Sequence, residues 1–219
     1  MSDAYVEPVD AATLILLRGD EVLMGLRNRK HIFMPNVYVF PGGRCDADDA
    51  EVDPVITLPP LQVERLSTST STERANVLGL TAIRETFEET GLIVGHPGSD
   101  EKSDLPGWQA FYDLGFVPAL DCLEYFARAI TPEGSPRRFD ARFFITDASR
   151  VHGTLQGNGE LLDLQWIKLE KTSELELPTV TSLVLELLKR KAQGNPQEAL
   201  QVAQDFEARH GREVFEYHI

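Results

Sequence analysis

Apolar and polar residues follow two different spacings along this chain, and the spacings predict where strands and helices lie. Residues 11–18 are almost continuously apolar, which is typical of a buried strand, and a glycine-aspartate turn lets residues 21–27 return beside them as a hairpin. Residues 123–130 and 141–146 predict a second antiparallel pair, and residues 161–167 predict an edge strand or a half-buried strand. Strands are therefore expected in both halves of the chain.

The longest helical pattern covers about residues 71–90 and has a signal at each end. Its apolar positions recur at helical spacing and would face the core: Leu80, Ile83 and Phe87. Thr70 and Glu73 fit a capping box, in which each side chain accepts a hydrogen bond from the other residue's backbone N–H. Gly91 follows the last turn, where a left-handed residue commonly ends a helix.

Shorter helical patterns occur in three further segments: 108–114, 181–191 and 196–209. Residues 44–69 are rich in acidic residues, prolines and hydroxyl side chains, so they predict a loop insertion. The mixed order of strands and helices predicts an α+β fold in a single domain over residues 1–219. Residues 195–219 are expected to form a C-terminal helical extension of that domain.

Three carboxylates share one face of the long predicted helix. Glu85, Glu88 and Glu89 lie at offsets of three and four positions, which bring side chains together in a helix. Like charges at this spacing repel, so such a cluster is best tolerated beside a cation, although most charge runs are simply solvated surface. Carboxylate oxygens suit Mg²⁺, Mn²⁺ or Ca²⁺ rather than zinc. This helix face is therefore a candidate site for a hard divalent metal.

Composition favours a soluble, globular protein. Of the 219 residues, 42% are hydrophobic and 26% charged, and no apolar run approaches the roughly 20 residues that span a bilayer. The first residues lack the basic and apolar segments of a secretory signal. Cys45 and Cys122 have no metal-ligand spacing, so we expect reduced thiols in a cytoplasmic protein without a membrane partner.

The formal net charge is −14 and the sequence pI is near 4.7, which argues against a nucleic-acid partner. The same charge would repel an anionic small molecule, so local positive charge would be needed to bind one. Two groups of basic residues could supply it: Arg27, Arg29, Lys30, His31 and Arg44, and then Arg137 with Arg138. Each could equally be ordinary surface charge.

Residues 41–43 (PGG) and 84–92 (RETFEETGL) together resemble the two halves of the Nudix box, G-x5-E-x7-R-E-U-x-E-E-x-G-U, where U is a bulky apolar residue. The resemblance implies a Nudix-type α/β/α sandwich with a mixed sheet over about residues 10–192. It also implies Mg²⁺- or Mn²⁺-dependent hydrolysis of a nucleoside diphosphate linked to another moiety. Gly42 and Gly43 would then allow close backbone approach to this substrate.

The box departs from its usual form at several positions. Gly43 and Arg84 are 41 positions apart rather than 14, which indicates roughly 27 residues inserted within the box. Counted back eight positions from Arg84, the first-half glutamate falls on Asn76, and Glu73 is the nearest acidic residue on the same helix. Thr86 occupies a position that is usually aliphatic. We expect the insertion to border the substrate pocket, because it leaves from the glycine turn and returns at the metal helix.

A divided box of this kind resembles the coenzyme A diphosphatases of peroxisomal and mitochondrial type and their bacterial relatives. Leu23, Arg27 and residues 40–43 match part of their CoA-associated motif, L-L-T-x-R-[SA]-x3-R-x3-G-x3-F-P-G-G. Four positions of this motif differ here: Gly25, Asn28, Ile32 and Asn36. The resemblance implies cleavage of CoA or acyl-CoA to 3′,5′-ADP and a 4′-phosphopantetheine. ADP-ribose, NADH or a nucleotide sugar is the alternative substrate, and a non-catalytic ligand-binding domain is the alternative to an enzyme.

The resemblance also implies roles for individual residues. Arg84 would hold Glu85, which would serve as a metal ligand and a candidate base. Glu160, on a glycine-rich loop before a strand, is a second candidate base, or else an ordinary strand-edge glutamate. Arg27 and Arg44 are the candidates for phosphate contacts.

The last predicted helix carries an apolar stripe: Ala199, Leu200, Ala203 and Phe206. This stripe could pack on its own domain or form the seam of a homodimer.

Overall fold

The computed structural model describes residues 6–29, 35–98, 102–210 and 215–218. The strands of its main sheet are β1 (Val9–Arg18), β2 (Glu21–Arg27), β3 (Tyr38–Val39), β4 (Gly42–Arg44), β8 (Glu124–Ile130), β9 (Phe139–Asp147), β11 (Leu161–Lys168) and β12 (Phe215–Tyr217). The order is β11-β2-β1-β9-β8-β12, with β3 paired to β2 and β4 paired to β1. Strands β1 and β9 are parallel, and the other pairs are antiparallel. The two predicted antiparallel pairs are confirmed.

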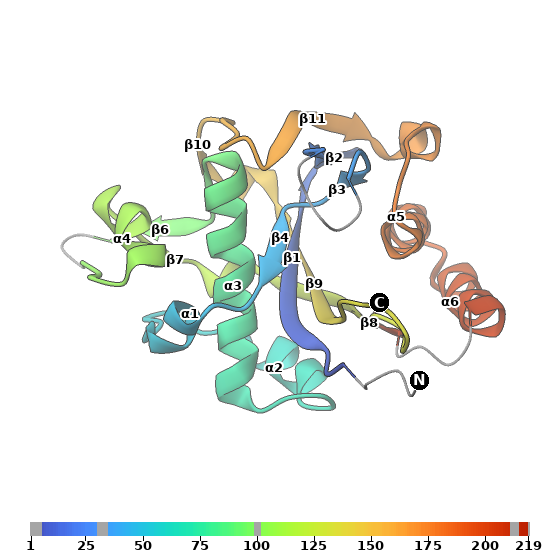
Figure 1. Cartoon of the computed structure of the whole chain (residues 1–219), viewed down its shortest axis with the longest axis horizontal. Helices are drawn as coiled ribbons and strands as arrows, with labels where there is room; N and C mark the ends of the chain where they lie inside the picture. Colours follow the sequence, from blue (N-terminus) through green and yellow to red (C-terminus); the bar gives the residue numbers. More distant parts are fainter. Residues whose placement is uncertain (1–5, 30–34, 99–101, 211–214, 219) are drawn as a thin grey trace.

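Helices cover both faces of this sheet (Figure 1). They are α1 (Ala47–Glu51), α2 (Pro60–Leu66), α3 (Thr72–Thr90), α4 (Pro106–Asp113), α5 (Thr179–Ala192) and α6 (Pro196–His210). Alternate residues of β1 point to opposite faces, so Leu14 belongs to the core under α3, whereas Ile15 belongs to the core under α5 and α6. The predicted α+β sandwich with a mixed sheet is confirmed.

Short elements complete the chain around this framework. Two small sheets pair β5 (Leu92–Ile93) with β10 (His152–Gly153), and β6 (Gly95–Pro97) with β7 (Phe116–Pro118). Among the described residues, 3₁₀ helices occur at Leu120–Cys122, Ala148–Arg150 and Leu169–Glu174. Along the described ranges, no helix combines the length and the apolarity that crossing a bilayer demands.

Helix α3 begins one residue later than the sequence predicts. Ser71, rather than Thr70, is the N-cap, and its hydroxyl accepts the backbone N–H of Arg74 at 3.2 Å. Both residues carry a hydroxyl, so the pattern could not distinguish them. At the other end Gly91 has a left-handed φ of 70° and donates its N–H to the carbonyl of Phe87, as predicted.

The predicted loop insertion contains two short helices, so the loop assignment is wrong for these residues. Asp46 caps α1 with a reciprocal capping box that involves Asp49. Helix α2 begins at Pro60, where the missing N–H of proline costs no hydrogen bond. Its Gln62 side chain accepts the backbone N–H of Tyr125 at 2.9 Å, which ties α2 to β8. The insertion is therefore packed against the domain.

The C-terminal segment is not entirely helical. Helix α6 packs on α5 and buries Ala199 and Ala203, and β12 then joins the edge of the main sheet beside β8. The predicted helical extension over 195–219 is wrong for this last strand. A strand of three residues is too short to show a spacing of its own.

Candidate active site

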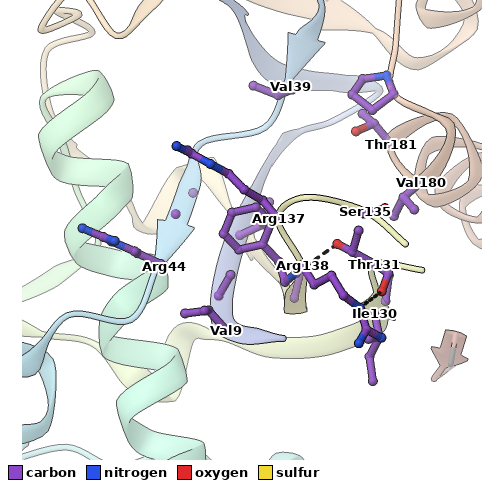
Figure 2. Close-up of a pocket in the computed structure, with 18 of the residues that line it drawn as sticks. Val9, Val39, Arg44, Ile130, Thr131, Ser135, Arg137, Arg138, Val180 and Thr181 are labelled. Atoms are coloured by element: carbon purple, nitrogen blue, oxygen red, sulfur yellow. Dashed lines mark hydrogen bonds between the residues drawn. The ribbon is translucent and has the colours of Figure 1, made fainter. Parts of the chain in front are cut away.

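The predicted site residues meet at one cavity of about 1180 Å³ beside the glycine turn (Figure 2). Seven of them line it: Arg27, Gly42, Gly43, Arg44, Glu85, Glu89 and Glu160. The other two, Arg84 and Glu88, adjoin this group, because Arg84 forms ion pairs with both Glu85 and Glu88. Within residues 44–69, all of which the structure describes, the lining takes in Arg44 alone. The prediction that the insertion borders the pocket therefore holds for its first residue and is wrong for residues 45–69.

The two glycines of β4 let the helix carboxylates reach this cavity. Gly42 donates its backbone N–H to Oε2 of Glu89 at 2.9 Å. A Cβ atom on Gly43 would lie 2.5 Å from Cδ of Glu85, and one on Gly42 would lie 2.6 Å from the carbonyl oxygen of Ala12. Any other residue at either position would have to displace the strand or the carboxylate.

Arg84 is buried behind these carboxylates and is held on several sides. Its Nε and Nη2 donate to the two carboxylate oxygens of Asp49 at 2.7 and 2.9 Å. Its Nη1 lies 3.0 Å from Glu85 and 3.3 Å from Glu88, and Nη2 also donates to the carbonyl of Arg44 at 3.2 Å. This fork fixes the orientation of Glu85 and connects α3 to the glycine turn.

Asp49 is the important residue that the sequence prediction missed. It is fully buried and accepts hydrogen bonds from the side chains of Arg84, Thr81 and Trp108 and from the backbone N–H of Asp46. Counting forward from Gly43 would have found it, because five residues separate Gly43 from Asp49, as in the first half of the box. The inserted residues therefore follow α1 instead of beginning at the glycine turn.

Asn76, the position reached by counting backwards, has a different task. Its Oδ1 accepts the backbone N–H of Leu58 at 3.0 Å, so it anchors the segment that connects α1 to α2. Asp49 thus supports Arg84 from the first-half position of the box, with a side chain that is one methylene shorter than the usual glutamate.

The carboxylates that face the cavity are poorly compensated by positive charge. The pKa of Glu89 is raised to about 8, chiefly by burial and also by the nearby charges of Glu85 and Glu160, although the hydrogen bond from the Gly42 N–H lowers it. Burial also raises the pKa of Glu85 to about 7, although Arg84 opposes the shift. The pKa of Glu88 is raised by burial too. Such carboxylates would be stabilised in their ionised form by a divalent cation.

Their oxygen atoms fit a hard ion that shares its coordination with a substrate. Mg²⁺ is commonly bound through one or two protein carboxylates together with phosphate oxygens, so a tightly closed protein cage is not required. Within the described residues, the one group of three ligand atoms lying within 4.8 Å of one another is elsewhere, at His96, Asp121 and Cys122. There Nη1 of Arg150 lies 3.4 Å from Sγ of Cys122, and its positive charge disfavours a bound cation.

Glu160 lines the same cavity and lies just before β11. Its N–H donates to Oδ1 of Asn158 at 2.9 Å, and its carbonyl accepts the N–H of Asn28 at 3.1 Å, so its backbone is anchored. Its side chain is exposed, and its charge contributes to the raised pKa values of Glu88 and Glu89. This position suits a carboxylate that exchanges protons with water.

Arginines from three separate segments line the same cavity: Arg27, Arg44 and Arg137. In Figure 2, Arg137 projects between Arg44 and Val180. Its neighbour Arg138 lines the cavity as well but is buried, and it donates to the carbonyls of Thr131 and Val6 at 2.9 Å each, which is a structural task.

The remaining members of the predicted basic group do not add to this set. Nε of Arg29 donates to Asn36 at 3.2 Å, and Arg29 does not line the cavity. Lys30 and His31 lie outside the described residues.

Comparisons with known proteins agree with this fold and motif. No family model matches the sequence. The chain is 25% identical to acyl-coenzyme A diphosphatase NUDT19 of Xenopus laevis over 67% of its own length and 52% of that protein, and 25% identical to the Gallus gallus NUDT19 over 67% and 53%. The chain thus spans about half the length of these curated relatives.

A solved structure gives the same result. The crystal structure of a Nudix hydrolase from Alicyclobacillus acidocaldarius superimposes with a TM-score of 0.62 and 26% identity, covering 84% of this chain and 91% of that one. With the residues that match the Nudix box placed on α3 and β4, this chain is similar to Nudix hydrolases in both fold and motif.

Proposed function

We propose that this chain is a divalent-metal-dependent hydrolase that cleaves the diphosphate linkage of CoA or an acyl-CoA. Water would add across the P–O–P linkage and release 3′,5′-ADP and the corresponding 4′-phosphopantetheine. The observation that carries the proposal is one cavity in which Glu85 and Glu89 face Arg27, Arg44 and Arg137. The carboxylates offer ligands for a cation, and the arginines offer positive charge for phosphate groups that an acidic protein would otherwise repel.

In this proposal Glu85, Glu88 and Glu89 hold Mg²⁺ or Mn²⁺. A divalent ion there would neutralise the diphosphate and promote ionisation of water. Arg84 positions Glu85 through their 3.0 Å contact, and Asp49 in turn fixes the guanidinium of Arg84. The gain in rate would come from placing charge where the diphosphate reacts.

Glu160 is the proposed general base. It lines the cavity together with Glu85 and Glu89, and its exposed carboxylate can take a proton from water and return it to solvent. Its anchored backbone would hold the carboxylate near the diphosphate during the reaction.

Two observations support CoA as the substrate. The curated relatives from Xenopus and Gallus are named acyl-coenzyme A diphosphatases. In addition, Leu23, Arg27 and residues 40–43 keep their places in the CoA-associated motif, and both Arg27 and Gly42 line the cavity.

The test is a substrate panel: CoA, acetyl-CoA, ADP-ribose, NADH and UDP-glucose, each with Mg²⁺ and with Mn²⁺. Glu88→Gln removes a proposed ligand, and Glu73→Gln is the matched control, because Glu73 is an exposed residue of the same helix. We expect cleavage of CoA compounds by the wild-type and control proteins and its loss in Glu88→Gln. Preferential cleavage of ADP-ribose or UDP-glucose would reject CoA as the substrate. No cleavage of any compound by the folded protein would reject the hydrolase proposal.

A further inference from the structure

The cavity continues across the main sheet, well beyond the carboxylates, along a row of small residues. Strand pairing places Arg44 of β4 beside Ala11, Ala11 beside Ala141, and Ala141 beside Ala129. These four residues all line the cavity, and Phe215 of β12 is the next partner in the row. Neighbouring strands lie about 4.8 Å apart, so the row from Arg44 to Ala129 measures roughly 14 Å. The alanines thus form the floor of a trough that starts at a candidate phosphate contact.

Large apolar side chains line this cavity as well: Ile130, Phe143, Val180 and Phe206. Phe206 lies at the far end of the trough, because its ring packs on Phe215, the partner of Ala129. Val180 comes from the start of α5 and Phe206 from α6, so the C-terminal helix contributes to the wall. Val6 and Val9 line the same cavity and are 39% and 48% exposed, which is high for valine. In Figure 2, Val180 lies on the opposite side of the cavity from Arg44, with Arg137 between them.

We infer that the far, apolar end of this trough binds the acyl chain of an acyl-CoA, and that Phe206 and Val180 determine how strongly chain length affects turnover. The inference rests on the proposed function. A sugar bonded directly to the diphosphate would be too compact to span roughly 14 Å from Arg44, whereas a long arm that ends in an acyl group can do so. Apolar walls around an alanine floor favour methylene groups, because burying each one fully strengthens binding about fourfold.

The experiment measures kcat/KM for free CoA, acetyl-CoA, hexanoyl-CoA and lauroyl-CoA with the wild-type protein and three variants. Phe206→Ser and Val180→Ser remove parts of the wall. Leu200→Ser is the matched control, because Leu200 is a 44% exposed residue of α6 that does not line the cavity. Since Phe206 also packs on Phe215, with ring centroids 6.1 Å apart, thermal unfolding of each variant accompanies the kinetics.

We expect wild-type kcat/KM to rise at least about tenfold from acetyl-CoA to lauroyl-CoA, mainly through KM. Phe206→Ser and Val180→Ser should each reduce this rise several-fold, and Leu200→Ser should leave it unchanged. Cleavage of all four compounds without a chain-length preference, or a preference that both wall variants retain, would overturn the inference while the proposed function stands. Absence of cleavage of every CoA compound would remove the proposed function and this inference together.

Discussion

Two buried carboxylates, Asp49 of α1 and Glu89 of α3, have very different surroundings. Asp49 is fully buried, and its oxygens accept hydrogen bonds from Arg84, Thr81 and Trp108. Glu89 is 5% exposed and accepts the N–H of Gly42, and burial raises its pKa to about 8. A buried carboxylate whose oxygens accept several hydrogen bonds stabilises the fold. A buried carboxylate with few donors around it marks a place where the protein can bind a cation. Asp49 therefore has a structural role, whereas Glu89 belongs to the candidate binding site.

The largest effect is expected from Asp49→Asn. This change removes the charge of the fully buried carboxylate that accepts two hydrogen bonds from Arg84, so the free energy of unfolding should fall by about 3–5 kcal/mol. Asp48→Asn is the matched control. Asp48 lies beside Asp49 in α1, is half-buried, and accepts a hydrogen bond from the Gly107 N–H at 3.0 Å. Urea unfolding checks both variants. Equal stability of the two variants would show that Asp49 is not a scaffold residue.

Glu89→Gln should affect activity far more than stability, which is the opposite of Asp49→Asn. It keeps the shape of the side chain and removes an uncompensated charge, so the metal-free protein should lose little stability at pH 8. Its kcat on CoA should nevertheless fall by about a hundredfold or more, because a proposed cation ligand is lost. Unfolding and steady-state kinetics measured side by side test this separation. A variant that loses stability but keeps its rate would reverse the roles assigned to Asp49 and Glu89.

The third prediction concerns pH. Glu85 and Glu89 have pKa values of about 7 and about 8 in the folded state, above the ordinary value of 4.5. At a pH between 4.5 and these raised values, the folded protein holds protons that the unfolded chain has released. Their contribution to stability is therefore present in acid and is lost as the pH rises through 7 and 8. In EDTA, the Tm of the wild-type protein relative to Glu89→Gln should fall between pH 5.5 and 8.5. A Tm difference that does not change with pH would contradict the raised pKa values.

The smallest effect should distinguish the two neighbouring arginines. Arg137 is exposed and projects into the cavity, whereas Arg138 is buried and donates to backbone carbonyls. Arg137→Ala should raise KM for CoA about tenfold with little change in kcat, and added salt should shrink the difference. Arg138→Ala should instead lower Tm. An unchanged KM in Arg137→Ala would remove this residue from the proposed phosphate contacts.

Much of the fold could be predicted because the spacing signals are long. The hairpin of β1 and β2, the pair of β8 and β9 and the helix α3 each extend over enough residues for their period to show. Strand β12 has three residues, and its position depends on pairing with β8 more than 80 positions earlier in the chain. No local pattern encodes such a contact.

The same distinction applies to the site. The carboxylate spacing on α3 predicted its cavity-facing side chains, since helix geometry alone sets their common face. The sequence prediction missed the partner of Arg84, because counting backwards from Arg84 crosses the insertion, whose folding returns Asp49 to α3 across 35 positions of sequence. The trough depends on strand register between β4, β1, β9 and β8, which the sequence pattern does not specify.

The cation site is tested most directly by a calorimetric titration with Mn²⁺ at pH 7.5 of the wild-type protein, Glu89→Gln and Glu73→Gln. We expect the wild-type protein and Glu73→Gln to bind Mn²⁺ with release of protons from the cavity carboxylates, and Glu89→Gln to bind it far more weakly. Equal binding by all three proteins, or no binding by the wild-type protein, would contradict the assignment of the uncompensated carboxylates as the cation site.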